Sequence, residues 1–202
     1  MWLNKGHDTF FSPKRIRVDH PKATKYLTSV LHRNLTPLIK ASKEVVVVCI
    51  GTDRSTGDAL GPLTGWYLNS MKRHPKMVVY GNLEDPVHAS NLNEIVSKIN
   101  EHHSHSLIIA VDACLGKSSS VGDISFKIGS LLPGKGVNKN LPPIGQAHII
   151  GVVNVGGFME YLVLQNTRLS IVMSMAKVIA LSISSWHLQA DSRLNTKAVN
   201  QL

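Results

Sequence analysis

The sequence predicts an α/β sandwich built on a largely parallel sheet. Two short apolar runs rich in β-branched residues, Val45–Ile50 and Leu107–Val111, are typical of central strands covered on both faces. Segments of helical periodicity separate these and the other predicted strands, and strands that alternate with helices form parallel sheets between helix layers. The length of 202 residues suits one domain, so a single such sandwich is expected.

The first half of the chain alternates between helices and strands. Residues 23–41 carry apolar side chains at three- and four-residue steps, which predicts a helix, although Pro37 weakens its far end. After the strand at 45–50, a polar loop at 51–57 leads into a helix over 58–73. The next expected elements are a strand at 77–80, a loop at 84–90, a helix at 91–100 and a strand at 107–111.

The second half is expected to complete the sheet and end in a helix. Residues 121–128 alternate in polarity, which favours a strand at or near a sheet edge. The segment 129–146 is rich in Gly and Pro, and a loop of that length is usually functional or mobile. A strand is expected at 147–155 and the last helix at 167–188, before a polar tail at 190–202.

The positive charge lies mainly at the beginning of the chain. The formal net charge is +9, but residues 1–43 hold nine Lys and Arg against two acids, a net of +7, which leaves +2 for the remainder. We therefore expect a basic N-terminal arm at 1–22, a single α/β domain at 23–189 and a polar C-terminal tail at 190–202. The nearly neutral domain argues against nucleic acid as its principal ligand.

The arm and the last helix raise two further possibilities. Lys14, Arg15 and Arg17 could contact phosphates, but charge blocks at chain ends are commonly solvated, so nucleic acid is not the expected partner. The run 169–188 is long enough for a membrane, yet it carries Lys177 near its middle and has helical spacing, which favours a core-packing helix. Without an apolar N-terminal signal segment, an intracellular protein with reduced cysteines is expected.

Acidic residues follow both central strands. Asp53 and Asp58 lie in Gly51–Pro62 (GTDRSTGDALGP), and Asp112 lies in Ile109–Gly116 (IAVDACLG), each at or just past the carboxyl end of a strand. Ligands of parallel sheets bind at that end. Two close carboxyl groups cannot easily both ionise, so one would hold a proton while the other activates water. The alternative is that these acids serve only as caps and turn residues.

Histidines near this edge leave a metal site open as an alternative. His88 lies in the loop after the strand at 77–80, and His148 lies near the start of a late strand. Either could reach the crevice, where Asp58, Asp112 and one histidine would offer oxygen, oxygen and nitrogen ligands to a divalent metal. No metal or other cofactor is required by the main hypothesis.

The remaining histidines and the cysteines indicate less. A solvated helix end is the expected place of three clustered histidines, His102, His103 and His105. Cys49 is expected in the core. A nucleophilic pair of Cys114 and His148 is conceivable, but no local signature supports it.

Three motifs together resemble a known family. IGTDRSTGDALGP, IIAVDACLG and LPGKGVNKN resemble, in the same order, segments of the YyaC family of spore-forming bacteria. That family is similar to the spore germination protease, an aspartic-type peptidase, and both are similar in fold to the hydrogenase maturation proteases. The resemblance covers roughly residues 44–185. It implies a three-layer sandwich, phosphorylase/hydrolase-like, with a twisted, mostly parallel or mixed sheet between helices.

The resemblance also implies roles for individual residues. Asp58 and Asp112 match the two catalytic aspartates of the germination protease and the places of metal-contacting acids in the hydrogenase proteases. His148 is a loose counterpart of a metal-contacting histidine. The chain is much shorter than the germination protease, and the segment between its aspartates differs.

We therefore expect a cytoplasmic protein of the developing or germinating spore that cleaves a peptide or small protein with Asp58 and Asp112. The alternative is a non-catalytic sporulation factor that binds such a partner. The loop 129–146 is expected to border the cleft, and the candidate cleft neighbours are Asp53, His88, His148 and Lys135.

Overall fold

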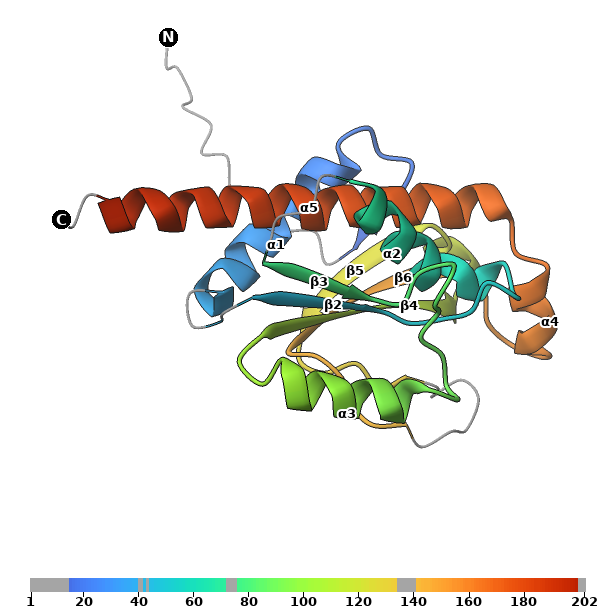
Figure 1. Cartoon of the computed structure of the whole chain (residues 1–202). Coiled ribbons are helices and arrows are strands. Elements are labelled where there is room, and N and C mark those ends of the chain that lie inside the picture. Colours follow the sequence, from blue (N-terminus) through green and yellow to red (C-terminus); the bar gives the residue numbers. More distant parts are fainter. Residues whose placement is uncertain (1–14, 40–41, 43, 72–75, 134–140, 200–202) are drawn as a thin grey trace, which may run out of the picture.

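Six strands form one mixed sheet that lies between helices (Figure 1). The computed structural model describes residues 15–39, 42, 44–71, 76–133 and 141–199, with side chains up to residue 190. The strand order is β1-β5-β6-β4-β2-β3. The strands are β1 (Ile16–Arg17), β2 (Val45–Cys49), β3 (Met77–Tyr80), β4 (Leu107–Gly116), β5 (Asp123–Ile128) and β6 (Ala147–Val155). β2, β3, β4 and β6 are mutually parallel, whereas β5 is antiparallel to both β6 and β1. The expected mostly parallel sheet is confirmed.

Helices cover both faces of the sheet, as the buried central strands require. α1 (Ala23–Ile39), α2 (Leu60–Ser70) and α5 (Leu169–Val199) lie on one face, and α3 (Leu92–His102) lies on the other (Figure 1). Every residue of β2 is buried. Its odd-numbered side chains belong to the larger core with α1, α2 and α5, and its even-numbered ones to the smaller core with α3. The three-layer arrangement follows from this two-sided burial.

α5 has the length and apolar composition of a membrane span, but one stripe of it lies in the protein core. The stripe consists of fully buried side chains, Val172, Met175, Ala176, Ile179, Ala180, Ile183 and Trp186. These residues belong to the same core as α1 and α2, which agrees with the expected core-packing helix. The helix continues to Val199, whereas a polar tail was expected from residue 190. Residues 190–199 contain no Gly or Pro, so no residue that usually ends a helix occurs there.

The expected N-terminal arm contributes a strand to the sheet. Ile16 pairs with Ile124 of β5, and its side chain is only 3% exposed in the larger core. A two-residue strand has no readable periodicity, which is why the sequence did not reveal it. The expected boundary at residue 22 therefore does not mark the edge of the fold, while residues 1–14, including Lys14, lie outside the described residues.

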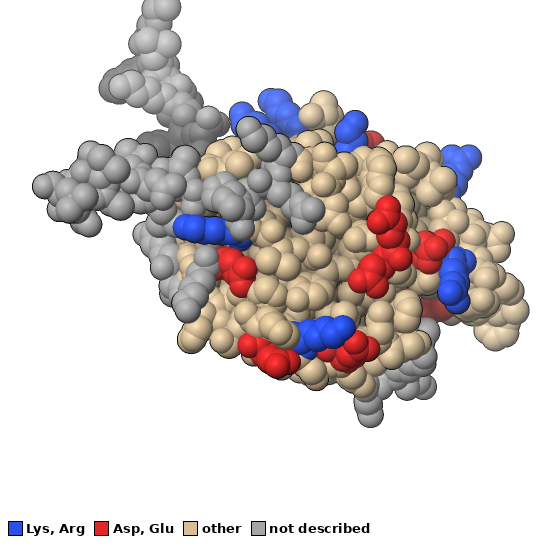
Figure 2. Space-filling view, in the orientation of Figure 1, with Lys and Arg blue, Asp and Glu red and all other residues tan. Residues whose placement is uncertain are grey.

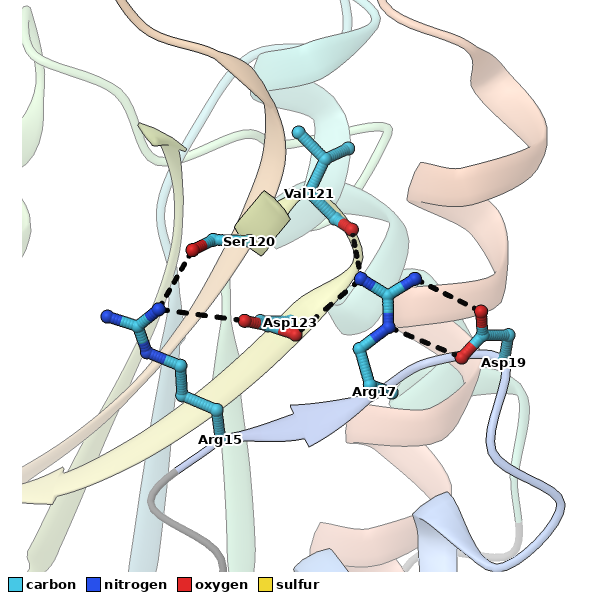
Figure 3. Close-up of polar contacts among 6 residues, drawn as sticks. All are labelled: Arg15, Arg17, Asp19, Ser120, Val121 and Asp123. Atoms are coloured by element: carbon cyan, nitrogen blue, oxygen red, sulfur yellow. Dashed lines mark hydrogen bonds and ion pairs between the residues drawn. The ribbon is translucent and has the colours of Figure 1, made fainter. Parts of the chain in front are cut away.

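Two arginines of the arm are held by a buried acid (Figure 3). Arg15 and Arg17 each lie 3.8 Å from a carboxylate oxygen of Asp123, which is 7% exposed. Arg15 also donates to the Ser120 hydroxyl at 2.8 Å, and Arg17 to the Val121 carbonyl oxygen at 2.7 Å. Phosphate contact by these two side chains was considered from sequence and not favoured, and in the structure they fasten β1 to the start of β5.

Candidate active site at the carboxyl end of the sheet

The junction of β2 and β4 is the topological switch point of the sheet. From β2 the chain passes through α2 to β3 on one side, and from β4 it passes to β5 and β6 on the other. The carboxyl ends of β2 and β4 are joined directly, because Cys49 pairs with Val111 and the Ile50 N–H donates to the Val111 carbonyl oxygen at 2.8 Å. Ligands of open α/β sheets bind beyond the strand ends at such a point.

Two glycines allow the segment that carries Asp58 to pack against the end of β2. Gly51 has φ +143°, and a Cβ there would lie 1.9 Å from the Asp58 carbonyl oxygen. A Cβ on Gly61 would lie 2.1 Å from the Ile50 carbonyl oxygen. The Thr52 N–H also donates to the Asp58 carbonyl oxygen at 3.2 Å. This close approach places Asp58, in the 3-10 helix Gly57–Ala59, directly beyond β2.

Asp112 lies inside β4, not beyond its end. The sequence placed the end of this strand at residue 111, but pairing with β6 continues from Asp112 opposite Ile150 to Gly116 opposite Val155. An irregularity between Cys114 and Leu115 interrupts the register. The sequence DACLG lacks the β-branched residues that signal a strand, so this extension had no periodic signature.

The two aspartates interact electrostatically, and their carboxyl groups are not equivalent. Burial, then the charge of Asp58, raises the pKa of Asp112 from 3.8 to about 8, against a hydrogen bond from the Ala113 N–H. Burial also raises the pKa of Asp58, against the Thr52 backbone and the charge of His88. Asp112 is therefore the protonated member at neutral pH, and the pair titrates as a unit.

Of the other predicted neighbours, His88 interacts with Asp58, whereas Asp53 is an exposed residue of the loop after β2. His88 is partly buried, and its charge acts on Asp58. Asp53 is exposed and accepts a hydrogen bond from the Thr52 hydroxyl at 3.4 Å, as a turn residue would. Lys135 lies outside the described residues.

The structure does not bring His148 together with the two aspartates, so the alternative metal site of Asp58, Asp112 and His148 is wrong. It pairs with Ala110 in the register, two residues before Asp112, and its Nδ1 lies 2.8 Å from the Gly129 carbonyl oxygen. Among the residues that the structure describes, no group of three His, Cys, Asp or Glu side chains is arranged to hold a metal ion. The set of Asp58, Asp112 and His148 is thus not assembled.

Cys114 does not have the environment of a nucleophile. Burial, and next the charge of Asp112, raises the pKa of its thiol from 9.0 to about 11. A catalytic cysteine requires the opposite shift, because the thiolate is the reactive form. The conceivable pairing of Cys114 with His148 has no support from this geometry.

The described parts of the loop 129–146 are anchored on the face of the sheet that packs against α3. Leu131 and Ile144 form an antiparallel bridge and are buried in the smaller core. The intervening residues 134–140 lie outside the described residues, so the expected bordering of the cleft stays a prediction.

His103 differs from the solvated position that the sequence suggested. Its Nδ1 lies 2.6 Å from a Glu44 carboxylate oxygen, and its Nε2 lies 3.0 Å from the Tyr80 hydroxyl. Ser106 donates to the same Glu44 oxygen at 2.9 Å. This network joins the end of α3 to the beginnings of β2 and β4, and its partners are distant in sequence, so no local pattern could reveal it. His102 and His105 are exposed as expected.

The structure has a short helix, α4 (Glu160–Gln165), within residues 156–166, for which no element was predicted from sequence. A Cβ added to Gly57 would lie 2.8 Å from Leu164 and Thr167 side-chain atoms, so the end of α4 packs on the 3-10 helix of Asp58. Large apolar side chains are exposed on and around α4, namely Val155, Phe158, Met159, Tyr161, Leu162, Leu169 and Met173. We call these seven residues the α4 apolar surface. Exposed apolar patches mark interaction sites in many soluble proteins.

Charge on the visible face is mixed, with a small group of acidic side chains toward the α4 end (Figure 2). Asp53 in the loop after β2, and Glu84 and Asp85 in the loop after β3, are exposed acids at this end of the sheet. The described loops after β2 and β3, which follow the same end of the sheet as the aspartate pair, therefore do not carry the basic surplus of the chain.

Comparisons with known proteins agree with the fold. A family model described as "Protein of unknown function (DUF1256)" matches residues 15–182. The chain is 48% identical over 186 residues to a Bacillus subtilis (strain 168) protein described as "Uncharacterized protein YyaC", which covers 90% of this chain and 89% of that protein.

Among solved structures, the chain is similar to a NiFe hydrogenase maturation protease, HycI, from Thermococcus kodakarensis KOD1. The TM-score is 0.51 with 16% sequence identity, over 75% of this chain and 97% of that one. This similarity establishes the fold that the sequence motifs implied, and the fold alone.

Proposed function

We propose that this chain, which belongs to the DUF1256 family, is an aspartic-type peptidase in which Asp58 and Asp112 activate water. The observation that carries this proposal is the unequal pair of carboxyl groups at the switch point, where the pKa of Asp112 is raised to about 8. A base and an acid that act on the same bond are what peptide hydrolysis requires.

In the proposed reaction, the Asp58 carboxylate accepts a proton from water while the water oxygen attacks the peptide carbonyl carbon. Asp112 donates its proton to the carbonyl oxygen, which gives a neutral tetrahedral diol. The proton on Asp58 then passes to the amide nitrogen, the C–N bond breaks, and a diol hydroxyl returns a proton to Asp112. The products are an amine and a carboxylic acid, and both side chains regain their starting protonation states.

The α4 apolar surface supports a peptide or small protein as the substrate. Phe158 is 91% exposed and Tyr161 is 68% exposed, beside a helix that packs on the turn of Asp58. Aromatic side chains at such positions supply much of the binding energy in protein recognition. Neither a metal nor nucleic acid nor a membrane has a part in this proposal.

The biological setting belongs to the proposal as well. The resemblance to the YyaC family and to the germination protease supports a role in sporulation or germination, in the cytoplasm of the developing or germinating spore. A second candidate function is a non-catalytic sporulation factor that binds its peptide or protein partner in the same crevice. The exposed Phe158 and Tyr161 favour binding, whether or not cleavage follows.

The test is hydrolysis of a peptide library and of spore proteins by the full chain, followed by mass spectrometry. Asp58→Asn and Asp112→Asn should each reduce cleavage by about 100-fold or more, as loss of a general acid or base does. Asp53→Asn, which changes an exposed acid five residues away, is the matched control and should retain activity. Unchanged hydrolysis in both site variants would sink the peptidase proposal. Peptide binding by the wild type without turnover from pH 4 to 9 would favour the second candidate.

A further inference from the structure

The face of the sheet that packs against α3 is only partly covered where it carries Asp112. Side chains alternate between the two faces along β4, so Asp112 lies on the same face as Ala110, which belongs to the smaller core. Asp112 pairs with Ile150 of β6, and both residues are partly exposed. On the opposite face of the same two strands, Val111 and Ile149 are fully buried. Because β4 and β6 are interior strands, this exposure is due to incomplete cover of the face and not to a sheet edge.

The strand register places Lys127 of β5 on this face as well. His148 of β6 pairs with Ala110 on one side and with Lys127 on the other, so these three residues form one row across the sheet. Asp112 and Ile150 belong to the next row toward the carboxyl ends of β4 and β6. Two strand spacings and a step of two residues separate the Cα atoms of Lys127 and Asp112 by roughly 12 Å. An extended peptide covers that distance with about three or four residues.

Among the described residues, no acid compensates the charge of Lys127. Its side chain is exposed, and it forms no ion pair within the described part of the chain. A second cation on this side of the sheet, Arg15, differs in this respect, because it lies 3.8 Å from a carboxylate oxygen of Asp123 (Figure 3). The charges of Lys127 and Arg15 both act on the thiol of Cys114 in β4, which agrees with the placement that the register gives.

The two sides of the aspartate pair carry opposite charges. On the β3 side, Glu84 and Asp85 are exposed acids in the loop 81–91, which contains no Lys or Arg. On the other side, Lys127 lies beyond β6 in the strand order. A negatively charged side chain of a bound peptide is repelled by the first side and attracted by the second. The charges therefore favour a peptide whose acidic residue lies over β5.

We propose that Lys127 is a specificity-determining residue, and that the peptide cleaved by the aspartate pair carries an acidic side chain about three or four residues from the cleaved bond, bound by the Lys127 ammonium group. This inference rests on the proposed peptidase function and deepens it by naming the substrate class, an extended acidic peptide. The ion pair forms at an exposed position, so it adds a modest preference to an affinity that other contacts supply.

The test is a binding measurement on the full chain that carries Asp112→Asn. This substitution prevents cleavage during the titration and leaves the charge unchanged, because Asp112 is protonated at neutral pH. The probes are two fluorescein-labelled pools of random dodecapeptides, which differ only in one fixed central residue, Glu or Gln. By fluorescence anisotropy at low salt, the Glu pool should bind roughly 2- to 5-fold more tightly, as an exposed ion pair allows. The difference should shrink at high salt.

Substitutions of Lys127 in the same background identify the residue responsible. Lys127→Arg should keep the preference for Glu, Lys127→Gln should abolish it, and Lys127→Glu should reverse it. Lys177→Glu makes the same charge change at an exposed position of α5, on the opposite face of the sheet, and is the matched control that should keep the preference. Equal binding of the two pools, or a preference for Glu that survives Lys127→Glu, would overturn the proposal.

Cleavage by the chain with Asp112 intact separates this inference from the peptidase function. If peptides are cleaved without any enrichment of Asp or Glu near the cleaved bond, the role of Lys127 is refuted while the peptidase function stands. If no peptide is cleaved but the Glu pool is preferred through Lys127, the peptidase function fails while the acidic-peptide site is confirmed.

Discussion

Replacement of Asp112 by asparagine should stabilise the protein at neutral pH. The pKa of Asp112 is raised from 3.8 to about 8, first by burial and then by the charge of Asp58. A carboxyl group with a raised native pKa favours the folded state fully below its unfolded pKa, and this advantage is lost as the pH rises through 3.8 toward about 8. At pH 7 about three pH units lie between the unfolded pKa of 3.8 and the solution pH, each worth about 1.4 kcal/mol, so Asp112 lowers the free energy of unfolding by about 4 kcal/mol at this pH.

Asparagine has nearly the same shape and is neutral in both the folded and the unfolded state, so it takes up no proton on folding. Its Oδ1 can still accept from the Ala113 N–H, while its new amide N–H₂ needs a partner, at a cost of about 1–2 kcal/mol. We therefore expect a net gain of about 2–3 kcal/mol in the free energy of unfolding at pH 7. Between pH 5 and 8 the wild type should lose about 4 kcal/mol more than the variant, because other titrations cancel in the comparison.

Urea unfolding at pH 5, 6, 7 and 8, followed by circular dichroism, measures both quantities. Asp53→Asn is the control for a generic loss of negative charge, and it should follow the wild type at every pH. The reasoning is refuted if Asp112→Asn destabilises the protein by the same amount at all four pH values. That result would mean that Asp112 is ionised in the native state and held by interactions that asparagine cannot replace.

Three further predictions follow from packing and exposure. Gly61→Ala should destabilise by about 1–3 kcal/mol in urea unfolding, because its Cβ would meet the Ile50 carbonyl oxygen at 2.1 Å; stability equal to wild type would contradict the close approach. Asp123→Ala should lower the free energy of unfolding by about 1–2 kcal/mol, a modest loss because Arg15 and Arg17 remain half-exposed to water. It should also release β1 from β5, and unchanged amide exchange at Ile16 would count against this. Phe158→Ser should leave unfolding within about 0.5 kcal/mol of the wild type but weaken peptide binding at least severalfold by fluorescence titration; unaltered affinity would remove the α4 apolar surface from substrate recognition.

The sequence predicted the elements whose signal is local and periodic. Val45–Cys49 is buried at every position, and its apolar run revealed a central strand without any structural knowledge. Asp58 was likewise expected beyond that strand, because the polar loop at 51–57 follows the apolar run directly. Parallel strands bring their carboxyl ends to one edge, so Asp58 and Asp112 were expected to face one another if the two central strands were neighbours, and β2 and β4 do pair directly.

Features that depend on long-range pairing could not be predicted in this way. The continuation of β4 through Asp112 is due to its pairing with β6, and β1 exists because Ile16 fills the core beside β5. The separation of His148 from the aspartates follows from strand register, which the sequence of one strand does not specify. The position of the loop that carries His88 also depends on a bridge between two residues that are 37 positions apart, Ile50 and Val87.

The most direct test of the proposed chemistry is peptide cleavage in H₂¹⁸O under single-turnover conditions, with the products weighed by mass spectrometry. If Asp58 and Asp112 activate water, each new carboxyl terminus should carry one ¹⁸O atom, and the product should be absent with Asp58→Asn and with Asp112→Asn. An accumulating covalent adduct on the protein would contradict the account, as would ¹⁸O-labelled product formed at the wild-type rate by both variants.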